Sequence, residues 1–455
     1  MTSAYLTRKL GPDGYGLFSL AAGLMIFIGA TAVSLFSRGT IKLIAEAEDP
    51  GPVATTVLRM HVACGFATTF IVMLLARPLA LVLDEPRLTF YLLLFALDPF
   101  LLVLARAHRS ILIGTGRFRE QAVPLAVRQL ARLLLIVVLV EGGLSIAGAV
   151  LGLVGASFVE LLAYRRFVRP RFIPASNYPA GRIWSEATPI FFAALFLALF
   201  GRVDLFALTA LGLPTSEAGY YGAAQNLSIV PGLFAVSFTP LLLSTLSTLR
   251  RNGEHESVRA MGRAAIRVVL GMMPFAAMVS GASNEIVRLI FGADFAPTGP
   301  LLACLIVGKV AAVTISITFV MLIAAERAVL SVLLAAPMLA LALAGHLTFI
   351  PRYGALGAAC VTAGLEITGA LLALVLAHRF LGVSPPGSTL ARSVLISAAV
   401  WLAATSWPAA GAWLVVKLAL IVAGIVVAYA LLGEFTPGEI AWFRAFVRRV
   451  CSRTA

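Results

Sequence analysis

The chain has 455 residues, of which 60% are hydrophobic and only 12% are charged, and its mean hydropathy is +0.98. A soluble domain carries about 25% charged residues because its surface faces water, so this composition excludes an ordinary soluble fold. The formal net charge of +14 could suit nucleic acid, but the basic residues lie in short loops between apolar segments and form no basic domain. The composition therefore predicts a membrane protein with no nucleic-acid partner.

Apolar segments of about twenty residues recur along the whole chain. Because a helix rises about 1.5 Å per residue, each segment can cross a hydrocarbon core roughly 30 Å thick. The segments between Gly, Pro and charged clusters predict thirteen spans: 14–37, 55–83, 88–113, 121–141, 143–164, 184–212, 218–246, 259–283, 297–324, 328–350, 354–380, 389–407 and 411–432. The expected fold class is all-α, a polytopic bundle of about thirteen transmembrane helices.

The distribution of basic residues predicts which loops face the cytoplasm, because cytoplasmic loops are enriched in Lys and Arg. One set of alternate loops, together with the C-terminal tail, holds 24 of the 35 basic residues, and the opposite set holds six. The asymmetry supports the span count and places the C-terminus in the cytoplasm.

Residues 1–13 show neither the apolar core nor the cleavage site of a secretory signal. The cysteines have no metal-ligand spacing, so neither a metal nor a cofactor is predicted.

Two Gly-rich loops about 200 residues apart resemble each other. The first covers residues 10–16, with the sequence LGPDGYG, and the second runs from Leu211-Gly212 to the segment EAGYYG at 217–222. Six predicted spans separate them, so the two copies share one orientation, as in parallel repeats that enclose a substrate path. The second loop follows a full helix and the first follows only nine residues. The repeat therefore predicts a further helix before Leu10, either omitted by a late start or lost by truncation.

Four segments carry a resemblance to a known family. The segment 10–18 (LGPDGYGLF) resembles the outer turn that opens the bacterial polysaccharide-biosynthesis membrane proteins, the oligosaccharide flippases. The segments 202–224, 285–295 and 353–359 resemble the family's mid-chain pattern, an outer loop and a helix turn. They lie in the expected order between Leu10 and about Leu381. The chain departs from the family pattern by lacking most of the first of fourteen helices.

The resemblance implies a fold related to multidrug exporters, with two pseudo-symmetric six-helix lobes and two extra helices. The expected domains are an N-terminal lobe at 1–182, a C-terminal lobe at 183–383, two additional helices at 384–432 and a basic cytoplasmic tail at 433–455. The implied cargo is a polyprenyl-diphosphate-linked oligosaccharide, flipped across the bacterial inner membrane for O-antigen, lipopolysaccharide or exopolysaccharide synthesis. The implied partners are membrane lipids, a polysaccharide polymerase and glycosyltransferases.

Several charged residues lie deep within predicted spans, where a charge costs about 2.5–3.5 kcal/mol. One interpretation places the basic residues along a cationic cavity between the lobes, since arginine binds phosphate in a bidentate manner. The alternative is that they extend to the interface or pair with acids. Asp98 and Glu366 are predicted either to carry coupling protons or to pair with these basic residues. Lys417 is predicted to extend to the outer interface. The candidate substrate-binding residues are Arg202, Lys309, Arg128, Arg132, Gln225 and Asn226.

Gln225 and Asn226 follow the second Gly-Tyr turn, where they could bind sugar hydroxyls or form hydrogen bonds with neighbouring helices.

The first rival function is a drug exporter of the same fold, similar to the MATE transporters. Such a site should be more acidic, whereas the deep charges here are mainly basic. A membrane glycosyltransferase is the second rival, but the longest predicted outer loop has about thirteen residues, 284–296, and no nucleotide-binding loop occurs. The sequence therefore predicts a transporter rather than an enzyme. A non-transporting scaffold is the third rival, left open by the missing helix.

Overall fold

The computed structural model describes residues 2–34, 40, 41, 43, 44, 47, 49–169 and 201–435. Most of the predicted span 184–212, the proposed lobe boundary at 182–183 and most of the basic tail at 433–455 lie outside these residues. The described elements are α1 (Thr2–Ser34), α3 (Pro50–Val82), α4 (Leu88–Phe95), α5 (Leu97–Gly114), α6 (Phe118–Leu139), η1 (Val140–Leu144), α7 (Ser145–Phe167), α9 (Val203–Ala210), α10 (Thr215–Ser228), α11 (Val230–Arg251), α12 (His255–Leu270), α13 (Met273–Gly281), α14 (Ser283–Phe291), η2 (Ala293–Phe295), α15 (Thr298–Ala324), α16 (Ala328–Leu381), α17 (Gly387–Ser406) and α18 (Ala412–Leu431). All of these elements are helical, which confirms the predicted fold class.

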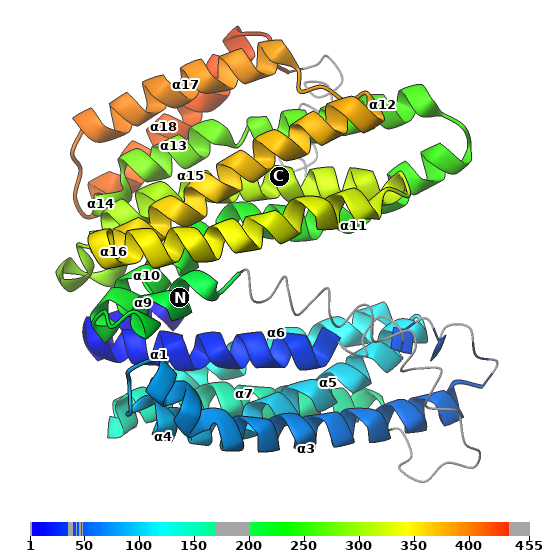
Figure 1. Cartoon of the computed structure of the whole chain (residues 1–455), viewed down its shortest axis with the longest axis vertical. Helices are drawn as coiled ribbons and strands as arrows, with labels where there is room; N and C mark the ends of the chain where they lie inside the picture. The colour runs from blue at the N-terminus through cyan, green and yellow to red at the C-terminus, as the bar shows by residue number, and fades with distance from the viewer. Residues whose placement is uncertain are drawn as a thin grey trace, which may run out of the picture. The chain divides into compact units, whose positions relative to one another are not determined.

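Ten helices within the described ranges are long and apolar enough to cross a membrane. Two of them, Phe118–Phe167 with 50 residues and Val329–Leu381 with 53 residues, are too long for a single pass of roughly 30 Å. Each is interrupted by a glycine with positive φ, Gly143 at 88° and Gly354 at 57°. The ten helices therefore make twelve passes, since these two each turn back once. In Figure 1, α16 doubles back on itself in this way.

The predicted spans agree with these passes wherever the chain is described. The segment 55–83 forms the continuous helix α3 although Pro78 lies inside it. The segment 389–407 corresponds to α17. The predicted span 218–246 is divided into α10 and α11 at residue 229, next to Pro231, because proline removes a backbone donor and interrupts the helical ladder.

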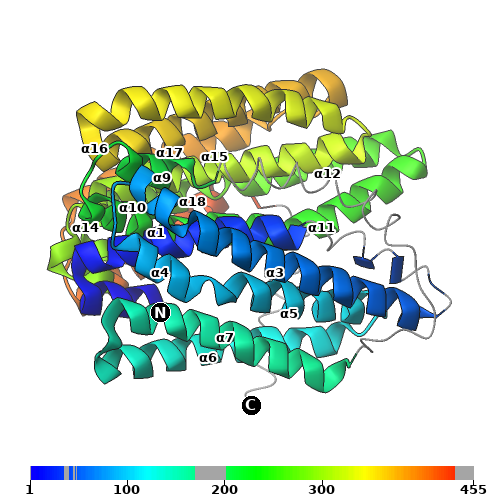
Figure 2. The same cartoon turned by 60° about the horizontal axis from the view of Figure 1, so that its bottom comes forward.

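Two compact units make up the chain, and each is described separately. The first contains Met1–Ala223 and Leu343–Ala358, and the second contains Ala224–Ala342 and Ala359–Ala455. In the first unit, α6 and α7 run side by side (Figures 1 and 2) and pack on α5 and α1. Tyr15, Phe95 and Tyr164 are among its largest fully or almost fully buried side chains.

The two Gly-rich segments of the proposed repeat are predicted as loops, but residues 12–16 lie in α1 and residues 217–222 lie in α10. In the first unit these two helices pack directly against each other. A Cβ atom on Gly16 would lie 1.9 Å from the carbonyl oxygen of Thr215, and one on Gly219 would lie 2.2 Å from that of Pro12. No side chain fits at either distance, so glycine is required for this approach of α1 to α10. The two resembling segments are thus contacting parts of one helix crossing.

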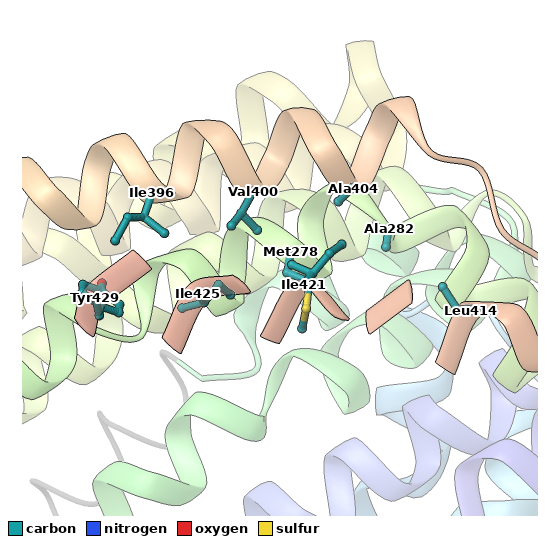
Figure 3. Close-up of a cluster of buried hydrophobic side chains, with 9 residues drawn as sticks. All are labelled: Met278, Ala282, Ile396, Val400, Ala404, Leu414, Ile421, Ile425 and Tyr429. Atoms are coloured by element: carbon teal, nitrogen blue, oxygen red, sulfur yellow. The ribbon is translucent and has the colours of Figure 1, made fainter. Parts of the chain in front are cut away.

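In the second unit, α13, α17 and α18 form an apolar core around Met278, Val400, Ile421 and Tyr429 (Figure 3). The hydroxyl groups of Tyr429 and Ser393 lie 2.8 Å apart, which gives the buried phenol a partner. Near one end of these helices Glu434 accepts hydrogen bonds from Arg267, Arg392 and Thr389. The bonds hold the end of α18 against α12 and α17.

Loops that the charge distribution places on the same side of the membrane contact one another within each unit. In the first unit, Arg87 donates to the predicted outer residues Asp13 and Glu85, and the hydroxyl of Thr215 also donates to Glu85. Glu217 accepts a hydrogen bond from the backbone of Ala355 at 3.1 Å. In the second unit the three residues bonded to Glu434 come from predicted cytoplasmic ends. These contacts agree with the alternation of outer and cytoplasmic loops.

Candidate functional site

A cluster of charged side chains lies among α5, α6 and α7 of the first unit. Arg128 and Arg132 are four residues apart, so they project from the same face of α6. Arg106 on α5 and Glu160 on α7 face the same cluster, as shown by the electrostatic interactions of Arg106 with Glu160 and Arg128. We call these four residues the arginine cluster. The neighbouring Asp98 is on α5 as well.

Arg128 is fixed by a chain of polar contacts that crosses the three helices. Its Nε lies 3.2 Å from Oε2 of Glu160, whose side chain is fully buried. Its Nη2 donates to the Ser157 hydroxyl at 3.5 Å, and that hydroxyl donates to Oδ1 of Asp98 at 2.6 Å. Asp98 is buried as well. Arg128 and Asp98 therefore have protein partners in this structure, as the pairing interpretation of the sequence expects.

Arg132 and Arg106 differ from Arg128. The Nε of each is buried and has no hydrogen-bond partner among the residues that the structure describes. Arg109, one turn beyond Arg106, donates from Nε to the side chain of Gln121 at 3.0 Å. Four arginines thus lie near two carboxylates, those of Asp98 and Glu160, so this part of the first unit carries a surplus of two positive charges. A partly buried surplus of guanidinium groups suits an anionic ligand.

Lys309 and Glu366 form an ion pair between α15 and α16 in the second unit. Glu366 is buried and 27% of the Lys309 side chain is exposed. The helices come close enough because residue 308 is glycine, where a Cβ would lie 2.6 Å from Oε2 of Glu366. The pairing of a deep basic residue with Glu366 is one of the two alternatives that the sequence left open, and in this structure the two charges balance each other.

Arg202 lies at the start of α9 and interacts electrostatically with Asp204 and Tyr15. Asp204 is buried, and its carboxylate accepts hydrogen bonds from the hydroxyl of Tyr221 at 2.7 Å and from the backbone of Leu205 at 2.8 Å. The buried ring of His346 also interacts with Asp204. The sequence assigned Arg202 to a cationic cavity, which stays a prediction, and did not predict this polar group.

The two amide candidates, Gln225 and Asn226, lie on α10. Asn226 is exposed and Gln225 is half-buried, and both make polar contacts in the structure. Their assignment to sugar binding stays a prediction.

The prediction that Lys417 extends to the interface is wrong, because its side chain is fully buried. It donates to Glu285 at 2.6 Å and to the carbonyl of Ala404 at 2.7 Å.

Sequence reasoning missed Glu160, Arg106 and Asp204 as members of these groups. Glu160 had a visible signal, since it is an acid inside the predicted span 143–164. Arg106 was assigned to a cytoplasmic loop, although α5 continues to Gly114 and includes it. The contacts of Asp204 with Tyr221 and His346 join residues 17 and 142 positions away, and no local pattern predicts such pairings.

The helices and the buried charges define a multi-pass membrane protein with the fold of the MOP-superfamily transporters. Over 98% of the chain, the structure matches the lipid II flippase MurJ in an inward closed conformation, with a TM-score of 0.76, 15% identity and 97% of that chain covered. An inward-facing multidrug resistance transporter of the MATE family matches with a TM-score of 0.73 and 15% identity, over 84% of this chain and 94% of that chain. A MOP-superfamily transporter from Pyrococcus furiosus gives a TM-score of 0.63 and 14% identity, over 84% and 91% of the two chains.

The family follows from the sequence itself. Residues 5–300 match the profile of the family described as polysaccharide biosynthesis protein. This match covers more than half of the chain, and the chain belongs to that family. No curated protein matches it by sequence. The resemblance inferred from the four short segments is thereby confirmed, and the structural matches confirm the expected relation to multidrug exporters at the level of the fold.

Proposed function

We propose that the protein is a flippase that moves a lipid-diphosphate-linked oligosaccharide from the cytoplasmic to the outer leaflet of the bacterial inner membrane, for synthesis of a cell-surface polysaccharide. Transport occurs by alternating access, in which the lobes at 1–182 and 183–383 move relative to each other. The lipid tail stays in the bilayer while the headgroup crosses. The proposal assigns no covalent chemistry to the chain.

The observation that carries the proposal is the positive surplus of the first unit. The diphosphate of the cargo carries negative charge, and it loses headgroup water as it leaves the interface. Partly desolvated guanidinium groups can replace that water with bidentate hydrogen bonds and keep their protons while they do so. Arg132 and Arg106 are the best placed for this role, because their Nε groups have no hydrogen-bond partner in the described part of the chain. Arg128 positions the cluster through Glu160.

The proposed roles of the other candidates follow from their surroundings. Arg202 is a further cargo contact, with its position set by Asp204 and Tyr15. Gln225 and Asn226 bind sugar hydroxyls. Lys309 and Glu366 form a pair that separates during transport, with Glu366 accepting the coupling proton and Lys309 becoming available to the cargo. A charged pair in an apolar setting is costly to separate, so this step requires compensation from the cargo or the proton.

Deletion of the gene tests the function. We expect loss of a surface polysaccharide and accumulation of its lipid-diphosphate precursor inside the cell, with both restored by the intact gene. Arg132→Ala should fail to restore either of them. Arg119→Ala is the matched control, since Arg119 is an exposed arginine near the start of the same helix. Unchanged glycan and precursor, with increased sensitivity to cationic drugs, would instead identify a drug exporter.

A further inference from the structure

A basic pocket lies in the second unit, at the end where α11, α12, α15 and α16 begin or finish. Its volume is about 470 Å³, which is within the usual range for ligand sites, roughly 300–1,000 Å³. Figure 1 shows α11 and α12 joined by a turn at this end. The charged or ionisable residues that line the pocket are Arg250, His255, Arg259, Arg327, His378 and Arg379. All six belong to loops that the charge distribution assigns to the cytoplasm.

The pocket has four arginines and no carboxylate among its lining residues. Within the part of the chain that the structure describes, none of the four makes an ion pair with an acidic side chain. The nearby Glu254 is occupied by Ser257, which donates to it at 3.1 Å. Among the described residues, no acidic side chain therefore forms an ion pair with the arginines of the pocket.

The partial negative charges of nearby helix ends offset only part of this positive charge. The C-terminal ends of α11, α15 and α16 meet at the pocket, and each contributes roughly half a negative charge. Their sum offsets less than half of four guanidinium charges, and the N-terminal ends of α12 and α16 each add roughly half a positive charge. A positive surplus remains that a phosphate group could neutralise.

Packing contacts hold several of these side chains in place. The guanidinium of Arg327 lies 5.0 Å from the ring centroid of Phe380, a cation–π contact. Arg259 lies against Gly382, where an added Cβ would be 3.3 Å from its Nε. The Nδ1 of His378 is 2.8 Å from the Ser384 hydroxyl. Because the arginines are positioned without being neutralised, less side-chain freedom is lost when an anion binds.

The other residues that line the pocket are apolar. Leu246, Met321 and Val383 line the pocket and are almost completely buried. A lining of apolar and basic side chains, between membrane-spanning helices at the end assigned to the cytoplasm, suits a phospholipid, whose phosphate adjoins its glycerol and acyl chains. A soluble anion would use the basic side chains alone.

We propose that this pocket binds the phosphate headgroup of an anionic phospholipid of the cytoplasmic leaflet. The site is formed within the second unit alone and is separate from the arginine cluster of the first. It goes beyond the proposed function, because it needs no transported cargo.

The experiment uses the purified full chain in neutral detergent and counts bound lipid by native mass spectrometry. We expect phosphatidylglycerol to bind at least tenfold more tightly than phosphatidylcholine. Each arginine near a lipid surface contributes about a fivefold gain in affinity, so Arg259→Gln combined with Arg327→Gln should weaken phosphatidylglycerol binding by about 25-fold. The control combines Arg119→Gln with Arg166→Gln, two exposed arginines of the first unit, and should change binding less than twofold.

Three results would overturn the assignment. The first is equal affinity of the wild-type protein for the two lipids, which requires no variant and so does not depend on variant folding. The second is unchanged binding by a double variant that elutes as a single species. The third is full displacement of phosphatidylglycerol by millimolar inorganic phosphate, which would indicate a soluble-anion site. Lipid binding is measured without cargo, so failure here is distinct from failure of the flippase proposal.

Discussion

The two units treat deep charges in different ways. In the first unit, Arg128 is paired with Glu160, but Arg106 and Arg132 add positive charge that the two local carboxylates do not balance. In the second unit, Lys309 and Glu366 form a pair with one charge of each sign. A surplus of charge can attract a ligand of opposite sign, whereas a balanced pair mainly satisfies itself. The comparison therefore supports the proposal that the anionic group of the cargo binds in the first unit.

Removal of the Glu160 charge should have the largest effect on stability. Glu160→Gln leaves Arg128 without its ion-pair partner, and breaking a buried pair costs about 3–5 kcal/mol. We expect that loss in the free energy of unfolding in detergent. Glu120→Gln is the control, because Glu120 forms a more exposed ion pair with Arg117, and such surface pairs contribute at most about 1 kcal/mol. Equal effects of the two substitutions would show that the arginine cluster does not depend on Glu160.

Substitutions of Lys309 and Glu366 in the second unit should have coupled effects on stability. Lys309→Met or Glu366→Leu alone should cost roughly 3 kcal/mol, because each leaves one charge of the pair without its partner. The two substitutions together should restore most of that stability. Under the proposed function the double variant still fails to restore surface polysaccharide in the deletion strain, since both roles require the charges. A double variant with normal surface polysaccharide would make the pair purely structural.

The sequence predicted the passes well because each pass is a local property. Twenty apolar residues are sufficient to identify α18, and the alternation of basic loops assigns its ends to sides of the membrane. The repeat of the two Gly-rich segments stays a prediction, and their direct contact through Gly16 and Gly219 was not predicted. That contact depends on how two helices cross, and glycine spacing alone does not determine the partner.

Pairing of deep charges was less predictable. Lys417 was predicted to reach the interface, but it is fully buried because Glu285, 132 residues earlier, lies beside it. Apolar residues surround these helices on every side, so the sequence pattern contains little information about which face points inward. The candidates Arg128 and Asp98 were identified correctly as deep charges, whereas their link through Ser157 required the packing of three helices.

The smallest expected effect is on the pH dependence of the melting temperature. It concerns Glu85, which lies outside the membrane-spanning helices, in contrast to Glu160 and Glu366. Hydrogen bonds from Arg87, and then from Thr215, lower the pKa of Glu85 below its ordinary value of 4.5 despite partial burial. A carboxylate with a lowered folded-state pKa stabilises the fold above its unfolded pKa, and this contribution is lost as the pH falls through the folded-state value. Melting temperature should therefore drop below about pH 4.5 more steeply in the wild type than in Glu85→Gln. Parallel pH profiles would contradict this account.

The central claim is that the positive surplus of the first unit acts on an anionic headgroup. The most direct measurement is flipping of a fluorescent polyprenyl-diphosphate oligosaccharide in proteoliposomes, for wild type, Arg132→Gln and the control Arg119→Gln. We expect Arg132→Gln to reduce the flipping rate at least tenfold while its melting temperature and the activity of the control stay close to wild type. Wild-type flipping by Arg132→Gln, or flipping of a cationic dye in place of the diphosphate lipid, would contradict the claim.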